Sequence, residues 1–321
     1  MKLHENNTLF SQSIQFAARV MKIQEVFIEK DYWITLVLKQ LSQSKYNNSV
    51  VFKGDTSLSK GYKIINRFSE DIDIAVLNVS ELSGNQVKNL IRDVEKDISA
   101  NLKDIPDHEG TSKGSRFRKS FYTFPISGDP RLYQAVSDKL IIEINSFANP
   151  FPFENREIVS LISSALTKNN QNELIKKYEL MPFTLKVLHK NQTMLEKLVS
   201  LFRSSFENNA VAGVSGKIRH FFDLYYLIND KECMSFIGSD DFKVRFKEIW
   251  DHDQKAFDEP IAWKGKSVKE SPLYIEFSNI WDSAKLTYFK ELPALAFSPV
   301  PKEEDVVKTM NFINKNLSHI I

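Results

Sequence analysis

The sequence predicts an α+β protein in which a mixed sheet with flanking helices is followed by a mostly helical second half. Over the first 150 residues, short apolar runs alternate with segments in which apolar residues recur every three or four positions. After that point the helical spacing dominates. The sequence NPFP at residues 149–152 marks the change, because proline interrupts regular structure. We therefore expect two domains, at residues 1–150 and 151–321.

Length and composition indicate a soluble globular protein. The 321 residues exceed one typical domain of about 100–200 residues, and 42% hydrophobic with 26% charged residues excludes a disordered or collagen-like chain. The 43 basic and 41 acidic residues give a net charge of +2, so the chain as a whole is not a strongly basic nucleic-acid binder. The single cysteine, Cys233, cannot form an intramolecular disulfide, and no run of about 18 apolar residues is present. These features predict a cytoplasmic protein without a membrane segment.

Strands and helices are expected to alternate in the first half. Two amphipathic helices come first, at residues 8–21 and 24–41. Short apolar runs then predict strands, at residues 49–52, 72–76, 117–124 and 140–147. A helix that begins near Thr56 separates the first two of these strands, and another helix at 86–102 follows the second strand.

The second half is expected to be mostly helical. Helical spacing is present at residues 157–166, 173–180, 193–206, 217–228, 275–289 and 305–316. A short apolar run at 184–188 predicts a strand that can rejoin the sheet. No internal repeat of about 20–50 residues is visible, which excludes a solenoid.

Two acids, Asp71 and Asp73, are separated by Ile72 at the start of the strand predicted at 72–76. Side chains on a strand alternate between its faces, so both acids are expected on one face while Ile72, Ile74 and Val76 point into the core. Such carboxylates can hold Mg²⁺ or Mn²⁺, and two ions about 4 Å apart support phosphoryl or nucleotidyl transfer. By itself, however, this pattern is more often the exposed end of a strand.

A glycine follows the strand predicted at 49–52 and precedes a helix. Gly54 lets the backbone approach a ligand, and the first turn of the helix offers free N–H groups to phosphate oxygens. Thr56 and Ser57 can add hydroxyl donors to a nucleotide. The alternative is equally common for either residue, which can simply be an N-cap of the helix.

A third carboxylate is required if these acids share divalent ions. Glu143 lies in the strand predicted at 140–147, whose neighbouring residues suit burial, and an isolated charge there is costly unless it is paired or bound to metal. We therefore select Glu143 as the third metal ligand. The alternative is an edge-strand glutamate that faces water or pairs with Lys139.

Basic and aromatic residues alternate around the strand predicted at 117–124. They are Lys113, Arg116, Phe117, Arg118, Lys119, Phe121 and Tyr122. The pattern is compatible with phosphate contacts beside rings that stack on bases. A half-buried strand gives the same pattern, and for each residue this second interpretation is the commoner one.

Several segments together resemble the signature of the AbiEii/AbiGii group of toxin nucleotidyltransferases, relatives of the MenT toxins. The central ones are FKGDTSLSK at 52–60 and RFSEDIDI at 67–74. IEKDYW at 28–33, TMLEKL at 193–198 and RHFFDL at 219–224 are also similar to the family. The resemblance extends from about Glu29 to Ile228. It implies a polymerase-beta-like nucleotidyltransferase core followed by a helical C-terminal part.

The resemblance also implies roles for residues in the second half. Lys197 would hold the triphosphate, and Asp223 would belong to the active site, where it orients a basic residue or the acceptor hydroxyl. Thr193 and Glu196 fit a capping box, which would place Lys197 in the first turns of a helix. In the alternative readings, Lys197 is a solvated lysine and Asp223 pairs with Arg219 on one helical face.

Two positions depart from the pattern of the family. The family usually has a small residue, commonly glycine, where this chain has Asp55. An added negative charge repels a triphosphate unless it points away or joins the metal ions. His220 stands where relatives often have another aspartate, and it can either pack or contact phosphate.

The activity that follows is transfer of a nucleoside monophosphate from an NTP to an acceptor hydroxyl, with release of pyrophosphate. The resemblance implies the tRNA 3′ end as acceptor and a growth-inhibiting toxin of a toxin–antitoxin or abortive-infection system. It also implies an antitoxin encoded alongside, which need not bind the toxin directly. The alternatives are nucleotidylation of a protein hydroxyl, kinase-like phosphate transfer, and a nucleotide-binding regulator without turnover, which Asp55 would favour.

Overall fold

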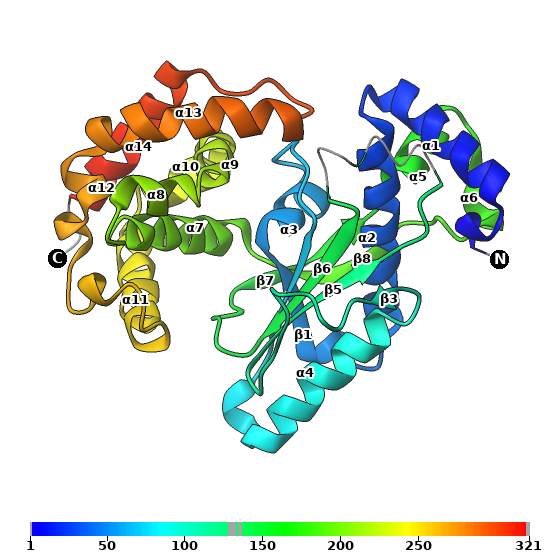
Figure 1. The fold of residues 1–321 in the computed structure, drawn as a ribbon, viewed down its shortest axis with the longest axis horizontal. Coiled ribbons are helices and arrows are strands. Elements are labelled where there is room, and N and C mark those ends of the chain that lie inside the picture. The colour runs from blue at the N-terminus through cyan, green and yellow to red at the C-terminus, as the bar shows by residue number, and fades with distance from the viewer. Residues whose placement is uncertain (1, 128–132, 134–136, 319–321) are drawn as a thin grey trace. The chain divides into compact units, whose positions relative to one another are not determined.

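The computed structural model describes residues 2–127, 133 and 137–318, and it divides the chain into two compact units (Figure 1). The first unit contains Met1–Tyr62 and Phe68–Leu188. The second contains Lys63–Arg67 and His189–Ile321, so a short segment of the first half belongs to the second unit. Among the described residues, none of the helices has both the length and the apolar character that a bilayer crossing requires.

The first unit is built on one mixed sheet with the strand order β3-β5-β6-β2-β1-β8-β7, to which β4 adds by pairing with β5. β2 pairs with β6, and β1 with β8, in parallel, while the other pairs are antiparallel. The strands are β1 (Val50–Lys53), β2 (Asp71–Val76), β3 (Lys103–Asp104), β4 (Ser112–Lys113), β5 (Phe117–Thr123), β6 (Lys139–Asn145), β7 (Phe153–Ile158) and β8 (Phe183–Leu188). The expected α+β class with a mixed sheet is confirmed.

Helices flank this sheet (Figure 1). They are α1 (Asn7–Met21), α2 (Glu25–Gln43), α3 (Gly54–Lys60), α4 (Gly84–Ile98), α5 (Leu161–Lys168) and α6 (Asn172–Lys177). α4 packs against β5 and β6, and α2 packs against α4, α5 and β8. Ile72, Ile74, Ile142 and Ile144 are all fully buried, which gives the sheet one apolar face. Burial of this area is the main stabilising contribution of the unit.

The second unit is helical. It contains α7 (Lys190–Ser204), α8 (Ala210–Ser215), α9 (Arg219–Ile228), α10 (Lys231–Ile237), α11 (Asp240–Ala256), α12 (Pro272–Ile275), α13 (Phe277–Leu295) and α14 (Glu303–Leu317). α7 packs against α8, α9, α10, α11 and α12. Large aromatic side chains, among them Phe222, Trp263 and Trp281, fill its core. The segment 63–67 joins this unit through a bridge between Arg67 and Ala296 and a hydrogen bond from Phe297 N to Asn66 O.

The units divide after Leu188 and not at the expected boundary near residue 150. The reason is that two more strands, β7 and β8, continue the sheet beyond that point. β8 was expected at 184–188, but β7 was not. Residues 157 and 158, expected to begin a helix, end β7 instead, because Glu157 and Ile158 pair with Thr184 and Phe183.

Two helices were not expected, and a third begins earlier than expected. α10 and α11 occupy 231–256, where no helix was expected. The prediction of a capping box at Thr193 and Glu196 is wrong, because α7 already begins at Lys190 and Thr193 is buried inside the helix. The N-cap is His189, whose Nδ1 accepts a hydrogen bond from the backbone N of Asn191.

Candidate active site

Three acids lie on the face of the sheet opposite the apolar one. Asp71 and Asp73 on β2 are half-buried, whereas Ile72 between them is fully buried, as the alternation of a strand requires. Glu143 on β6 is the direct cross-strand neighbour of Asp73. The parallel pairing of β2 with β6 therefore places Glu143 on the same face as the two aspartates.

Two lysines complete a row across four strands. Lys119 on β5 is the direct neighbour of Glu143, and Lys53 on β1 is the direct neighbour of Asp73. The row thus reads Lys119, Glu143, Asp73, Lys53. The Lys119 Nζ lies 2.6 Å from the Glu143 Oε1. Glu143 is not on an edge strand, because β6 lies between β5 and β2. Nor is Lys139 its partner, since Glu143 pairs with Lys119.

The electrostatics of this face disfavour full ionisation of the acids. Burial, with the charges of Glu143 and Glu70, raises the pKa of Asp71 to about 6. Burial, with the charges of Asp71 and Glu143, raises the pKa of Asp73 well above its ordinary value. Asp55 adds to the repulsion felt by both aspartates. Like charges this close are stabilised by a cation.

One oxygen of this group fits a metal ligand in particular. The Asp71 Oδ1 is buried and makes no hydrogen bond with any part of the chain that the structure describes. A buried carboxylate oxygen without a partner costs free energy, and coordination to a cation would remove that cost. Carboxylate oxygens are also the ligands that Mg²⁺ and Mn²⁺ prefer.

Gly54, the first residue of α3, allows the turn after β1 to approach β2. Its φ angle is +76°, a region that favours glycine. A Cβ atom at this position would lie 2.1 Å from the Asp73 Oδ2. The backbone at Gly54 therefore lies close to the carboxylate of Asp73, and its approach to a nucleotide stays a prediction.

The hydroxyl groups of Thr56 and Ser57 are used within the protein. Thr56 Oγ1 donates to the carbonyl oxygen of Asp71 at 2.5 Å, and Ser57 Oγ donates to that of Gly54 at 2.7 Å. Both side chains are buried. Neither residue is the N-cap, since α3 begins at Gly54. The Thr56 hydroxyl thus fixes α3 on β2, whereas the Ser57 hydroxyl makes its bond within the first turn of α3.

Two consecutive charged residues of α2, Lys30 and Asp31, contact the residue before Asp71 and the last residue of α3. The Lys30 Nζ, fully buried, lies 2.9 Å from the Glu70 Oε2 and also donates to the Ser137 carbonyl oxygen. Burial lowers the pKa of Lys30, and Glu70 opposes that effect. Lys60, the last residue of α3, lies 2.6 Å from Asp31. The segment IEKDYW was expected only as part of the family resemblance. Adjacent charges in an otherwise apolar helix were a signal that these side chains form buried ion pairs.

A buried ion cluster lies in the second unit. The Asp223 carboxylate on α9 accepts hydrogen bonds from Arg67 Nε at 2.7 Å and Arg67 Nη2 at 2.6 Å. Its Oδ2 also lies 2.7 Å from the Lys197 Nζ on α7. All three side chains are buried. Asp223 therefore orients two cations, and Arg67, which sequence reasoning did not select, belongs with it.

The alternative readings of this region are corrected by the same contacts. Lys197 is buried, so it is not a solvated lysine. Asp223 does not pair with Arg219, whose Nε lies 3.9 Å from Glu291 instead. His220 is half-buried in the first turn of α9.

The basic and aromatic residues around β5 are divided between two environments. Arg118 Nε lies 2.5 Å from Glu95 of α4, so it faces the helix-covered side of the sheet. Lys113 pairs with the exposed Asp104 at 3.4 Å. Lys119 is on the face of the carboxylates, as is Phe121, whose ring stacks on His108. The residues therefore do not form one continuous nucleic-acid surface.

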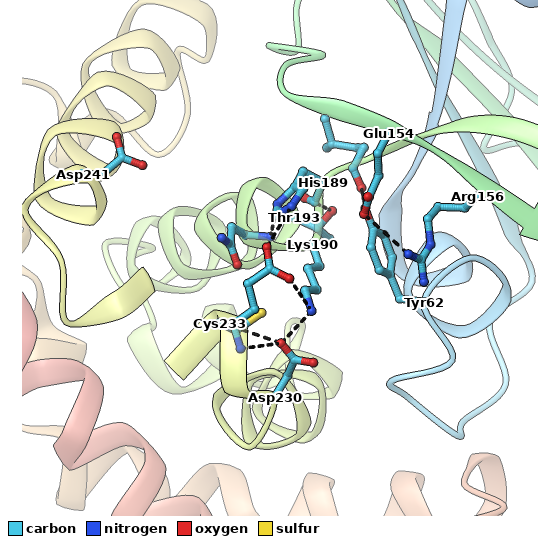
Figure 2. A network of polar contacts seen from close by, with 12 residues as sticks. Tyr62, Glu154, Arg156, His189, Lys190, Thr193, Asp230, Cys233 and Asp241 are labelled. Atoms are coloured by element: carbon cyan, nitrogen blue, oxygen red, sulfur yellow. Dashed lines mark hydrogen bonds and ion pairs between the residues drawn. The ribbon is translucent and has the colours of Figure 1, made fainter. Parts of the chain in front are cut away.

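Other polar contacts stabilise each unit separately, and Figure 2 shows them. In the second unit, the Lys190 Nζ lies 2.7 Å from Asp230, which also caps α10. Cys233 is buried there, and burial raises the pKa of its thiol. In the first unit, the Arg156 guanidinium lies 4.6 Å from the centre of the Tyr62 ring. These contacts are structural.

The chain is similar to known proteins over most of its length. The model of the AbiEii nucleotidyl transferase toxin family, a type IV toxin–antitoxin system, matches residues 36–302. Among solved structures, the chain is similar to MenT4, a nucleotidyltransferase toxin from Mycobacterium tuberculosis H37Rv. The TM-score is 0.55 at 15% identity, over 98% of this chain and 90% of MenT4. None of the curated proteins compared with the chain matches it. The family match covers most of the sequence, and the chain therefore belongs to the AbiEii family of nucleotidyltransferase toxins.

Proposed function

We propose that Asp71, Asp73 and Glu143 hold Mg²⁺ or Mn²⁺ and that the protein transfers a nucleoside monophosphate from an NTP to an acceptor hydroxyl. The observation that carries this proposal is the convergence of the three carboxylates on one face of the sheet, with an unpaired Asp71 oxygen among the described residues. A bond forms between the acceptor oxygen and the α-phosphorus, and the bond from the α-phosphorus to the pyrophosphate breaks. The divalent ions would activate the hydroxyl and neutralise the leaving pyrophosphate.

The residues of the chain would bind and orient the nucleotide. Gly54 lets the start of α3 lie against the Asp73 carboxylate, and Gly54, Thr56 and Ser57 would bind the phosphate groups of the nucleotide. The hydroxyls of Thr56 and Ser57 would contribute only after leaving the carbonyl oxygens that they now contact. Lys197 would neutralise the triphosphate, with Asp223 holding its ammonium group in place.

The acceptor that we propose is the 3′ hydroxyl of tRNA, and the cellular role is that of a toxin controlled by an antitoxin encoded alongside. The match to a family of nucleotidyltransferase toxins of a type IV toxin–antitoxin system supports the toxin role, whereas the choice of tRNA rests on the resemblance of the sequence motifs. A protein hydroxyl, or transfer of a single phosphate, would use the same carboxylates. A regulator without turnover is favoured by one observation, the negative charge of Asp55 beside Asp71 and Asp73.

Labelled NTPs distinguish these functions. The protein is incubated with Mg²⁺ and either purified tRNA or lysate protein, and each of the four NTPs is supplied in two forms, labelled at the α-phosphate or at the γ-phosphate. We expect label in tRNA, release of pyrophosphate, and loss of both in Asp71→Ala. Label in protein would show that the acceptor is a protein hydroxyl and not tRNA. Transfer of label from the γ-phosphate alone would indicate a kinase. Nucleotide binding without pyrophosphate release from any acceptor would favour the regulator.

A further inference from the structure

The row Lys119, Glu143, Asp73, Lys53 has its charges arranged as cation, anion, anion, cation. The two anions in its centre are proposed metal ligands. The Lys119 Nζ lies 2.6 Å from the Oε1 of Glu143, one of these two anions. An ammonium group at this distance repels a divalent ion approaching the same carboxylate, because like charges about 4 Å apart interact strongly near a protein surface. An ion that binds the Oε1 of Glu143 would therefore displace the ammonium group of Lys119 from that oxygen.

The side chain of Lys119 has room to do so. It is 30% exposed, compared with 21% for Glu143, and it lies on the open face of the sheet. An unbranched chain ending in an ammonium group has several rotamers available. The centre of the Phe121 ring lies 5.7 Å from the Lys119 Nζ. Lys30 and Arg118 each pair with an acid where the basic side chain is mostly buried, whereas the ion pair of Lys119 is the more exposed of the three among the described residues.

Lys119 is paired with an anion in this position. Its ammonium group lies 2.6 Å from the Glu143 Oε1, in the strand next to Glu143 and on the face that carries Asp71 and Asp73. When a divalent ion takes over the carboxylates, the ammonium group needs another anion. The anion that arrives with the ion in nucleotidyl transfer is a phosphate.

We propose that Lys119 is a further substrate-binding residue, whose ammonium group holds Glu143 in the metal-free protein and turns to a substrate phosphate when a divalent ion binds Glu143. The inference rests on the proposed function. It gives Lys119 two measurable effects of opposite sign. The lysine weakens binding of the metal alone, and it strengthens binding of the nucleotide.

Both effects can be measured in the full-length protein. Mn²⁺ binding without nucleotide is followed by the electron paramagnetic resonance signal of free Mn²⁺, and the KM for the NTP is measured separately. In Lys119→Ala we expect Mn²⁺ to bind about two- to fivefold tighter, the range of a partly exposed ion pair. We expect the KM to rise at least about tenfold, because a charged hydrogen bond to phosphate is lost. Lys119→Arg should keep both values near those of the wild type.

Lys113→Ala is the matched control, because Lys113 is also a lysine on the same sheet paired with an acid, Asp104. It should change neither value. Asp73→Asn identifies the metal site itself. If the wild-type protein has no Mn²⁺ site that Asp73→Asn weakens, the proposed function fails. If that site exists but Lys119→Ala leaves its affinity or the KM unchanged, only the assignment of Lys119 fails. Thermal unfolding of Lys119→Ala shows that the variant is folded.

Discussion

At the scale of single residues, Gly54 is a position that tolerates little change. A side chain there would meet two obstacles, the positive φ angle and the Asp73 carboxylate. We expect Gly54→Ala to lower the free energy of unfolding by about 1–3 kcal/mol and to abolish nucleotidyl transfer, because Asp73 must shift. Urea denaturation and the labelling assay measure the two effects. Gly84→Ala is the control, since its Cβ would meet no atom within 4 Å. Full activity of Gly54→Ala would contradict the close approach.

Asp71 gives the stability of the metal-free protein a distinctive pH dependence. Its pKa rises from the ordinary 3.8 to about 6 in the folded protein, so the folded state binds the proton more tightly than the unfolded chain does. Ionisation of Asp71 therefore destabilises the fold as the pH rises from about 4 to about 6. In EDTA at pH 8, Asp71→Asn should melt roughly 2–4 °C above the wild type, and this gain should vanish near pH 4.

Two additional measurements test that explanation. Mg²⁺ at pH 8 should raise the melting temperature of the wild type more than that of Asp71→Asn, because the ion relieves the same repulsion. The exposed Asp107 supplies the control, and Asp107→Asn should follow the wild type at every pH. A variant at Asp71 that is less stable than the wild type at pH 8 in EDTA would show that the repulsion is not dominant.

The ion cluster of the second unit predicts a large loss of stability. Asp223→Ala removes the carboxylate that Arg67 and Lys197 contact, and the loss should be about 3–5 kcal/mol. Arg67→Met in the same protein should recover part of it, since one buried charge is then removed. Tryptophan fluorescence in urea measures these values. Glu291→Ala, which removes only a surface partner of Arg219, should cost less than about 1 kcal/mol. Equal losses in both alanine variants would count against a buried cluster.

At the scale of elements, helix α2 anchors the helices around it through charged side chains. Asp31 accepts from Lys60 of α3 and from the backbone N of Leu161 at the start of α5. In Asp31→Ala we expect the amides of α3 and the first turn of α5 to exchange with solvent at least about tenfold faster. The amides of α4 are an internal reference and should not change. Asp97→Ala, an exposed position on α4, is the control. Unchanged protection of α3 would show that Lys60 is not its anchor.

The elements that could be predicted from sequence are those with a clear hydrophobic period. β2 and β6 have fully buried alternate residues, and α9 and α14 have one apolar side. β7 was missed because it is an edge strand with mostly polar, half-exposed residues. α11 was missed because only a few positions, such as Phe242 and Phe246, are buried among many charges. The start of α7 was placed too late because a buried Thr193 mimics a cap.

The carboxylate group could be predicted because alternation along one strand is a local rule. Asp71 and Asp73 follow from it directly, and Glu143 follows from the cost of a charge in an apolar strand. Lys119 was named among possible phosphate contacts, but its place beside Glu143 could not be predicted, since it depends on the register between β5 and β6. Arg67 and Asp223 are 156 residues apart, and no local pattern connects them. Contacts of this kind require the tertiary structure.

At the scale of the whole molecule, the proposed metal site and the buried ion cluster belong to different units. The three carboxylates and Lys119 all lie in the first unit, within residues 1–188. We expect a fragment of residues 1–188 to bind Mn²⁺ through Asp73 but to transfer no nucleotide, because it lacks Lys197. Circular dichroism checks that the fragment is folded, and Asp73→Asn in the fragment is the control. A folded fragment that binds no Mn²⁺ would contradict the assignment of the ligands.

The second unit is completed by five residues, Lys63–Arg67, from a distant part of the sequence. These residues contribute an arginine to its buried cluster and pair with Ala296. A chimaera that exchanges only the C-terminal half of two related toxins would combine a pentapeptide from one parent with a helical body from the other. Modular exchange within this family therefore has to transplant both pieces together, and substitutions in the pentapeptide are constrained by a body encoded more than a hundred codons downstream.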